Sequence, residues 1–116
     1  MELYLDTSTF VANFRLTNTQ TGETFEYVED LGREMAEKLL GTLRDKLAEH
    51  NKSFHDLTKI TFMSGPGSFT GLRIGAAIAN TLSHDLNIPL FDHHGEKHVI
   101  VIPDYGRPAN ISTPRK

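Results

Sequence analysis

The sequence predicts a single α/β domain built on a mixed β-sheet with its helices mainly on one face. Three observations lead to this fold class. Apolar residues alternate in the first thirty positions, two later stretches repeat apolar residues every four positions, and short apolar runs stand before and after the second stretch. With 116 residues, 38% of them hydrophobic and 23% charged, the chain has the size and composition of one globular domain. We expect that domain over residues 1–102, and a C-terminal extension or tail over the proline-containing residues 103–116.

The N-terminal third is predicted to form a three-stranded antiparallel meander. Leu3 and Leu5 share one side of the first strand, and every second position over residues 10–16 is apolar, as in a strand with one buried face. Turn-forming residues follow at 17–22, and residues 24–28 are rich in β-branched and aromatic side chains. The three segments are therefore expected to pair in the order of the sequence.

Residues 29–50 are predicted to form the first helix, with Asp30 as its N-cap. Its apolar stripe recurs every four residues, at Leu31, Met35, Leu39, Leu43 and Leu47. One face of this helix is therefore expected to be buried.

The second predicted helix, residues 68–86 with Ser68 as its N-cap, has three distinct sides. One side has almost no bulk, because it consists of Gly71, Gly75, Ala79 and Ser83. The neighbouring side carries Ile74, Ile78, Leu82 and Leu86, and the outer side carries Arg73, Asn80 and His84. A helix with a bulk-free side can lie unusually close to a sheet or to another helix.

Residues 60–63, 88–91 and 99–102 are short apolar runs and are predicted to be strands. The complete order is then three strands, a helix, a strand, a helix and two strands. A meander followed by strand–helix–strand units is found in one lobe of the ribonuclease-H-like, actin-like ATPases, and it implies a mixed sheet.

Residues 64–75 read SGPGSFTGLRIG and join a predicted strand to the second helix. The stretch lacks the lysine of a Walker phosphate loop, and Thr70 stands where the third glycine of a dinucleotide fingerprint would fall. The amides at the start of the helix could hold an anion. Alternatively, the glycines let the strand and the helix pack tightly, and the residues by themselves favour this second interpretation.

Two polar segments are further candidates for chemistry. Asp6, Thr7 and Ser8 end the first strand, where actin-like folds place the groups that face nucleotide phosphates and magnesium, but turn formation explains these residues equally well. His94 and His98 in DHHGEKH have the spacing with which a helix ligates zinc, but an extended segment would hold them about 13 Å apart. Because no third ligand is evident, we favour solvated loop histidines.

Charge and composition argue against several function classes. The net charge of −3 argues against a stand-alone nucleic-acid binder. The absence of cysteine excludes a disulfide framework, a thiolate metal site and a cysteine nucleophile. No apolar stretch is long enough to span a bilayer, so the expected location is the cytoplasm, without membrane attachment.

Three segments, DTST near the start, GPGSFTGLRIG and IPL, resemble the TsaB (YeaZ) family of the bacterial pathway that makes threonylcarbamoyladenosine on tRNA. The resemblance covers roughly residues 1–92 and favours a signature loop over a purely structural turn. It implies an actin-like fold without an intact ATP site, in which Asp6, Thr7 and Ser8 form a degenerate phosphate loop. The signature loop consists of Ser64, Gly65, Pro66, Gly67, Ser68, Phe69, Thr70 and Arg73.

The resemblance also implies a function. A TsaB-like protein is a non-catalytic platform that pairs with the catalytic paralogue TsaD, in a system with the ATPase TsaE, and that self-associates as a homodimer when alone. It needs no cofactor of its own; ATP and a metal are expected in the partner complex, and tRNA is reached through that complex. The helices at residues 31–50 and 68–86 would make the contact. We expect the partner-binding residues to be Gly71, Leu72, Gly75, Ile78, Ala79, Leu82, Leu39 and Leu43.

Two features depart from the TsaB pattern. Proteins of that family usually have about two lobes, so this chain corresponds to the N-terminal lobe or to a minimal version. The HHGEKH segment is similar to the TsaD-type motif in which two histidines bind the catalytic metal, which would make His94 and His98 ligands. The alternative hypothesis is therefore a one-lobe TsaD-like enzyme whose metal or nucleotide site is completed by oligomerisation.

Overall fold

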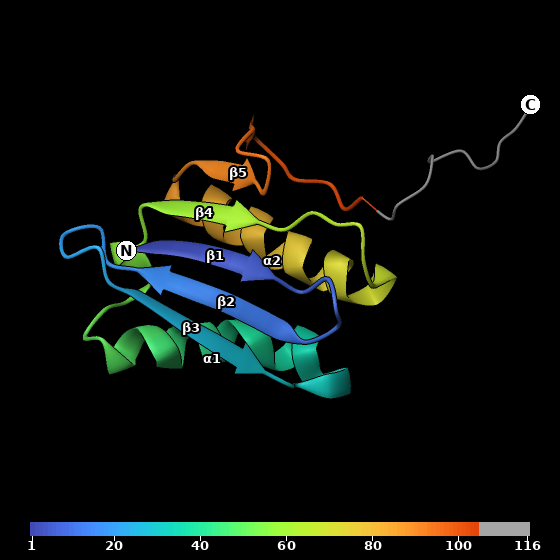
Figure 1. The fold of residues 1–116 in the computed structure, drawn as a ribbon, viewed down its shortest axis with the longest axis horizontal. Helices are drawn as coiled ribbons and strands as arrows, with labels where there is room; N and C mark the ends of the chain where they lie inside the picture. The colour runs from blue at the N-terminus through green and yellow to red at the C-terminus, as the bar shows by residue number, and fades with distance from the viewer. Residues whose placement is uncertain (105–116) are drawn as a thin grey trace, which may run out of the picture.

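The strands form one six-stranded sheet in the order β3-β2-β1-β4-β5-β6 (Figure 1). The structure is a computed structural model that describes residues 1–104. The strands are β1 (Glu2–Asp6), β2 (Ala12–Thr17), β3 (Thr24–Glu29), β4 (Lys59–Phe62), β5 (Leu90–Asp92) and β6 (Lys97–His98). The helices are α1 (Met35–Glu49) and α2 (Phe69–Leu86), with short 3-10 turns η1 (Gly32–Glu34) and η2 (Phe54–Asp56).

The pairing of β1 makes the sheet a mixed one, as predicted. This strand runs antiparallel to β2, with Leu3 opposite Leu16, and parallel to β4, with Leu3 beside Ile60. The parallel pair of β4 and β5 then places Leu90 beside Ile60. All four of these side chains are buried, so one row of the sheet forms the floor of the core.

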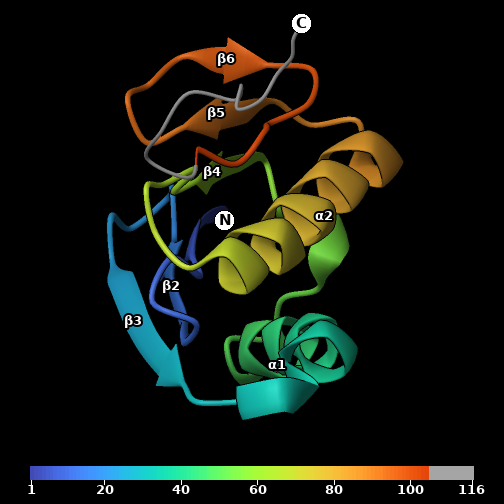
Figure 2. The ribbon, with the colours of Figure 1, turned by 90° about the vertical axis from the view of Figure 1, so that its right-hand side faces the viewer.

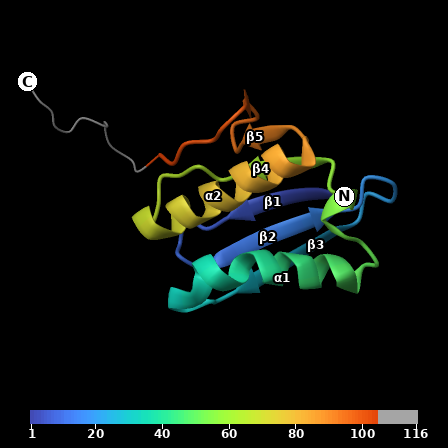
Figure 3. The same cartoon turned by 180° about the vertical axis from the view of Figure 1, so that it is seen from behind.

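Both helices cover the same face of the sheet (Figures 2 and 3). On α1 the predicted stripe is buried, at Met35, Leu39, Leu43 and Leu47. On α2 the predicted cap is present, because the Ser68 hydroxyl accepts a hydrogen bond from the Gly71 amide at 3.1 Å. The prediction of an α/β lobe with its helices on one face is therefore confirmed.

The opposite face of the sheet carries polar and amphipathic side chains. The Arg15 guanidinium lies 4.3 Å from the centre of the Tyr4 ring, and the Lys59 ammonium lies 4.6 Å from the centre of the Phe91 ring. Val28 on the edge strand β3 is 69% exposed. Within residues 1–104 this face carries no helix.

The first helix begins later than predicted. Residues 29–31 do not continue it, and a 3-10 turn at Gly32–Glu34 precedes α1. Asp30 is not its N-cap: the Asp30 carboxylate accepts a hydrogen bond from the Gly32 amide at 3.2 Å, which closes a local turn that competes with the helix. Glu34 occupies the cap position and makes no side-chain capping bond.

The last strand was predicted at residues 99–102, and this prediction is wrong. The strand is the two-residue β6, and the chain then leaves the sheet. Val101 is buried and is held by Asn80 of α2, whose side-chain amide accepts from the Val101 amide at 2.8 Å and donates to the Val101 carbonyl at 3.1 Å. Asn80 is therefore not on a free outer side of the helix. Of the tail predicted at 103–116, residues 105–116 lie outside the described part.

Candidate partner-binding site

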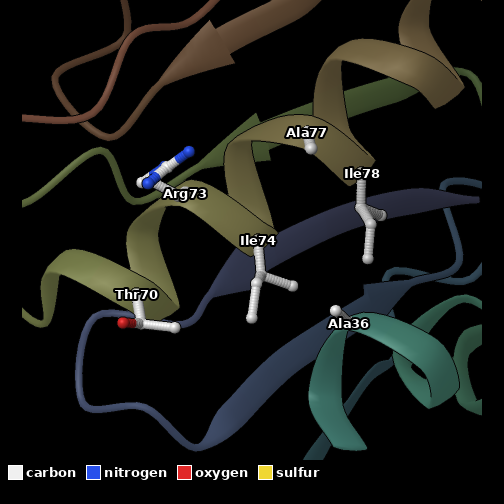
Figure 4. Close-up of a pocket in the computed structure, with 6 residues that line it drawn as sticks. All are labelled: Ala36, Thr70, Arg73, Ile74, Ala77 and Ile78. Atoms are coloured by element: carbon white, nitrogen blue, oxygen red, sulfur yellow. The ribbon is translucent and has the colours of Figure 1, made fainter.

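A groove of about 330 Å³ separates α1 from α2 on the helical face of the molecule. It is lined by Ala36, Thr70, Arg73, Ile74, Ala77 and Ile78. Ile74 and Ile78 project from α2 toward the gap above Ala36, while Arg73 leaves the helix on its outer side, at the rim (Figure 4). The groove therefore has apolar walls and one cationic edge.

Five of the six residues that line the groove belong to α2, and the sixth, Ala36, belongs to α1. Ile74 and Ile78 are half-buried and Ala77 is exposed, so a second molecule can reach them. Small side chains at Ala36 and Ala77 keep the groove open. Beyond its rim, Phe69 is 56% exposed, and the Arg73 guanidinium lies 5.3 Å from the centre of the Phe69 ring.

Most of the predicted partner-binding residues lie inside the chain and not at its surface. Seven of the eight are buried inside the chain itself, and these are Gly71, Leu72, Gly75, Ala79, Leu82, Leu39 and Leu43. Only Ile78 lines the groove. The bulk-free side of α2 is therefore used within the chain and leaves no surface there for a partner.

The physical reason is the close approach of α2 to the end of β1. A Cβ atom added at Gly71 would lie under 3.0 Å from the carbonyl oxygen of Thr7. One added at Gly75 would lie under 3.0 Å from both the Thr7 hydroxyl and the Phe62 ring, and nearer to the hydroxyl. Glycine at these positions lets the helix lie against its own sheet.

The signature loop joins β4 to α2 and is packed against the loop that follows β1. The peptide bond between Gly65 and Pro66 is cis. The Ser64 amide donates to Nδ1 of His93 at 3.2 Å. A Cβ atom on Gly67 would lie 2.5 Å from the carbonyl oxygen of Ser8, which favours the interpretation that this glycine serves tight packing.

The predicted phosphate loop makes its hydrogen bonds within the chain. Thr7 is fully buried, and its hydroxyl donates to the carbonyl oxygen of Gly71 at 2.6 Å. The Asp6 carboxylate accepts from the amide and from the hydroxyl of Ser8, at 2.8 and 2.6 Å. The Ser8 carbonyl in turn accepts from the Ser68 amide at 2.6 Å. These groups lock β1 to the start of α2, and the hydroxyl of Thr7 is turned inward.

The histidines of DHHGEKH lie on the hairpin between β5 and β6, and the structure does not assemble His94 and His98 as a ligand pair. The His94 ring packs on His93 with centroids 4.0 Å apart. Nε2 of His98 lies 2.7 Å from the Asp92 carboxylate, and Glu96 completes a cluster whose polar atoms lie within 4.8 Å of one another. The contacts described for His94 and His98 are thus made with different neighbours, and we assign no chemistry to the pair.

Asp92 is the most strongly perturbed acid of this hairpin. Its carboxylate is bound by His98 and also accepts hydrogen bonds from the backbone amides of Glu96 and His94, at 3.0 and 2.8 Å. The bond from His98, followed by these amides, lowers the pKa of Asp92 from 3.8 to about 2, against the opposing effect of burial. The arrangement stabilises a tight turn.

Ala36, Ile74 and Ala77 belong to the groove and were not predicted as site residues. Ile74 stood in the stripe beside the small residues, so its position on the helix was available from the sequence. Ala36 comes from a different helix, and only the packing of α1 beside α2 brings it to the site. Four-residue spacing alone does not say which of two neighbouring sides of a helix faces the sheet.

Comparisons with known proteins agree with this fold. A family model described as TsaD, tRNA N6-adenosine threonylcarbamoyltransferase, matches residues 28–105. The chain is 33% identical over 88 residues to the tRNA threonylcarbamoyladenosine biosynthesis protein TsaB of Bacillus subtilis (strain 168), which covers 76% of this chain and 38% of that protein. The TsaB protein of Escherichia coli (strain K12) is also 33% identical over 88 residues, covering 76% of this chain and 37% of the relative.

A solved structure gives the same relationship. YeaZ from Pseudomonas aeruginosa superposes with a TM-score of 0.70 at 33% identity, over 78% of this chain and 42% of that one. The chain thus spans about two-fifths of the length of the relatives it matches. Within residues 1–104, neither helix has the length and apolar character needed to cross a membrane. The sheet order, the two helices on one face and these matches together show that the chain belongs to the TsaB (YeaZ) family of tRNA threonylcarbamoyladenosine biosynthesis proteins.

Proposed function

We propose that this chain is a non-catalytic subunit of tRNA N6-threonylcarbamoyladenosine synthesis that binds a TsaD-type catalytic protein through the groove between α1 and α2. The groove carries the proposal: its walls at Ala36, Ile74, Ala77 and Ile78 are apolar and reachable by a second molecule. Apolar surface of this kind is typical of protein–protein interfaces. The names of the TsaB relatives supply the pathway.

The assignment as a subunit, in place of an enzyme, is supported by how the candidate chemical groups are used. Thr7, Asp6 and Ser8 are hydrogen-bonded within the chain, and His98 is paired with Asp92. In our proposal the partner supplies catalysis together with ATP and a metal, a TsaE-type ATPase belongs to the same system, and tRNA is bound through the complex. The proposed location is the cytoplasm, and alone the chain is proposed to form a homodimer.

Co-purification with the cognate TsaD-type protein tests the proposal. Ala77→Glu places a charge on an exposed groove wall without disturbing the core and should abolish the complex. Ile74→Asp should do the same, with a thermal melt to check its fold. Val28→Asp is the matched control, because Val28 is exposed on the opposite face of the sheet and its loss should leave binding unchanged.

The proposal also predicts an effect on the rate of tRNA modification. Adding the chain to the TsaD-type protein and its ATPase should raise the rate of tRNA modification, and the Ala77→Glu variant should not. A complex that forms equally well with both groove variants, or an unchanged rate upon addition of the native chain, would refute it.

A further inference from the structure

We infer that a hollow on the helix-free face of the sheet binds a free α-amino acid, with Arg15 on the carboxylate of the ligand and Asp6 on its ammonium group. The hollow has a volume of about 230 Å³, and its lining includes Tyr4, Asp6, Asn13, Arg15 and Glu26. It lies on the face of the sheet that Figure 1 turns toward the viewer, away from the groove between α1 and α2. The inference therefore does not depend on the proposed function.

Arg15 supplies the cation of the hollow. Its guanidinium lies 4.3 Å from the centre of the Tyr4 ring. Glu26 is its direct neighbour across the β2–β3 pair, yet none of the ion pairs within residues 1–104 joins the two side chains. The aromatic ring thus positions the guanidinium while its N–H donors remain available to a carboxylate, which a guanidinium can bind through two parallel hydrogen bonds.

Asp6 supplies a carboxylate whose orientation is fixed. The amide and the hydroxyl of Ser8 both donate to Oδ1, at 2.8 and 2.6 Å. In the part of the chain that the structure describes, Oδ2 accepts no hydrogen bond. Asp6 is paired with Asn13, two residues before Arg15 on β2, so Asp6 and Arg15 are diagonal neighbours about 7–8 Å apart. The two opposite charges therefore lie close together without neutralising each other.

Tyr4 lies between these two charges. It is paired with Arg15 across the β1–β2 pair, and it stands two residues before Asp6 on the same face of β1. Burial raises the pKa of Tyr4, the Asp6 carboxylate adds to that rise, and the Arg15 guanidinium opposes it. The Tyr4 hydroxyl is therefore within electrostatic reach of both charged groups, as expected for three side chains that share one hollow.

The charges of the hollow indicate the class of the ligand. Asp6 and Glu26 disfavour a simple anion such as phosphate, and Arg15 disfavours a metal cation. An α-amino acid satisfies both signs, because one carbon atom separates its ammonium group from its carboxylate. The volume of about 230 Å³ has room for about eight heavy atoms, at roughly the 30 Å³ that one water molecule occupies. Val28 also lines the hollow, so a small apolar side chain such as that of L-valine fits it in size and in character.

Titration of the ¹⁵N-labelled chain with L-valine, followed by NMR, tests the inference. The amide signals of β1, β2 and β3 should shift, with a Kd of about 1 mM for so small a ligand in an open site. L-valinamide lacks the carboxylate and N-acetyl-L-valine lacks the ammonium group. Each of these two analogues should bind about tenfold more weakly than L-valine, because each loses one charge-assisted contact.

Variants of the two charged residues should change the affinity in the same way. Arg15→Gln and Asp6→Asn should each raise the Kd for L-valine about tenfold, with a thermal melt to check that Asp6→Asn is folded. Arg15→Lys keeps the charge without the two-bond geometry and should lose less affinity than Arg15→Gln. Lys59→Gln is the matched control, because the Lys59 ammonium also lies over an aromatic ring, 4.6 Å from the centre of Phe91, but outside the hollow. Its Kd should equal that of the native chain.

Three results would overturn the inference. The first is that a large excess of L-valine shifts no amide signal of β1, β2 or β3. The second is that L-valinamide or N-acetyl-L-valine binds as tightly as L-valine, because the site would then not require both charges. The third is that Lys59→Gln weakens binding as much as Arg15→Gln does, which would indicate a diffuse electrostatic effect. None of these results affects the proposed function, which Ala77→Glu tests on the other face of the molecule.

Discussion

The two long sides of α2 differ in composition and in what they meet. The sheet side, with Gly71, Gly75 and Ala79, is buried against β1 and β4. The groove side, with Ile74 and Ala77, is accessible and lies beside α1. The small residues are the conspicuous pattern in the sequence, yet they are buried, whereas Ala77 on the groove side is exposed. Regular spacing of small residues therefore reports that something approaches closely, but does not say what approaches.

Of the changes that distinguish the sheet side of α2 from its groove side, Gly75→Leu is expected to have the largest effect on stability. A leucine there must displace the Thr7 side chain and the Phe62 ring from a filled interface. We expect the free energy of unfolding to fall by about 3 kcal/mol or more, as for severe overpacking. Urea denaturation followed by circular dichroism measures it.

Ala77→Leu is the matched control, because it adds a leucine two residues further along the same helix on the exposed side. The free energy of unfolding should change by no more than about 0.5 kcal/mol. Equal losses of stability for Gly75→Leu and Ala77→Leu would show that the two sides of α2 are not distinguished by burial.

A smaller effect on the sheet side is expected from Thr7→Val. This change keeps the volume of the side chain but removes the hydroxyl that donates to the Gly71 carbonyl. We expect a loss of about 1–2 kcal/mol in the free energy of unfolding, the usual result of breaking a buried hydrogen bond. Partner binding should be unchanged, because Thr7 is buried on the side away from the groove.

Thr9→Val on the same loop is the control. Thr9 is exposed, so the Thr9→Val variant should be as stable as the native chain. If Thr7→Val retained full stability but impaired binding of ATP or of the partner, the hydroxyl would have a functional role that its hydrogen bond to Gly71 does not express.

Local patterns were sufficient to predict most of the fold. Alternation predicted β1 and β2, β-branched and aromatic composition predicted β3, and a four-residue repeat predicted α1 and α2. Ser68 was identified as a cap because its hydroxyl needs only the backbone of the next turn. The element boundaries that were predicted wrongly depend on contacts with residues outside the local segment. The segment 99–102 has the composition of a strand but leaves the sheet, because Asn80 on a distant part of the chain binds both polar groups of Val101.

The candidate site was harder to predict than the fold. The sequence indicated that α2 has two unusual sides. Which side is buried follows from the close approach of Gly75 to Thr7, which the sequence does not reveal. Ala36 and Ile74 are far apart in the sequence and become one surface only when α1 lies beside α2. The helix face that meets the sheet is fixed by tertiary packing, so most residues chosen by spacing are buried against the chain's own sheet.

The cap of α2 affects both sides equally and should give an intermediate loss of stability. Ser68→Ala removes the oxygen that accepts from the Gly71 amide, and we expect about 1 kcal/mol lower stability. Thr70→Ala, an exposed change within the same first turn, is the control and should cost less. A Ser68→Ala variant as stable as Thr70→Ala would mean that the start of α2 is held by the loop packing at Gly67 instead of by the cap.

The smallest effect at neutral pH is expected at Asp92, which lies on neither side of α2. Its pKa is lowered from 3.8 to about 2, with the bond from His98 as the largest cause. A group whose pKa is lower in the folded chain contributes stability that is complete above its unfolded pKa of 3.8 and is lost as the pH falls through about 2. His98→Gln should therefore raise the pKa of Asp92 toward 3.8, as followed by NMR of its carboxyl carbon, and should reduce the loss of stability over that acidic range.

His94→Gln should leave the pKa of Asp92 unchanged, because His94 binds that carboxylate through its backbone amide and not through its ring. Both variants should bind the partner like the native chain, since the hairpin contributes no residue to the groove; impaired binding in either one would extend the interface beyond α1 and α2 to the end of β5.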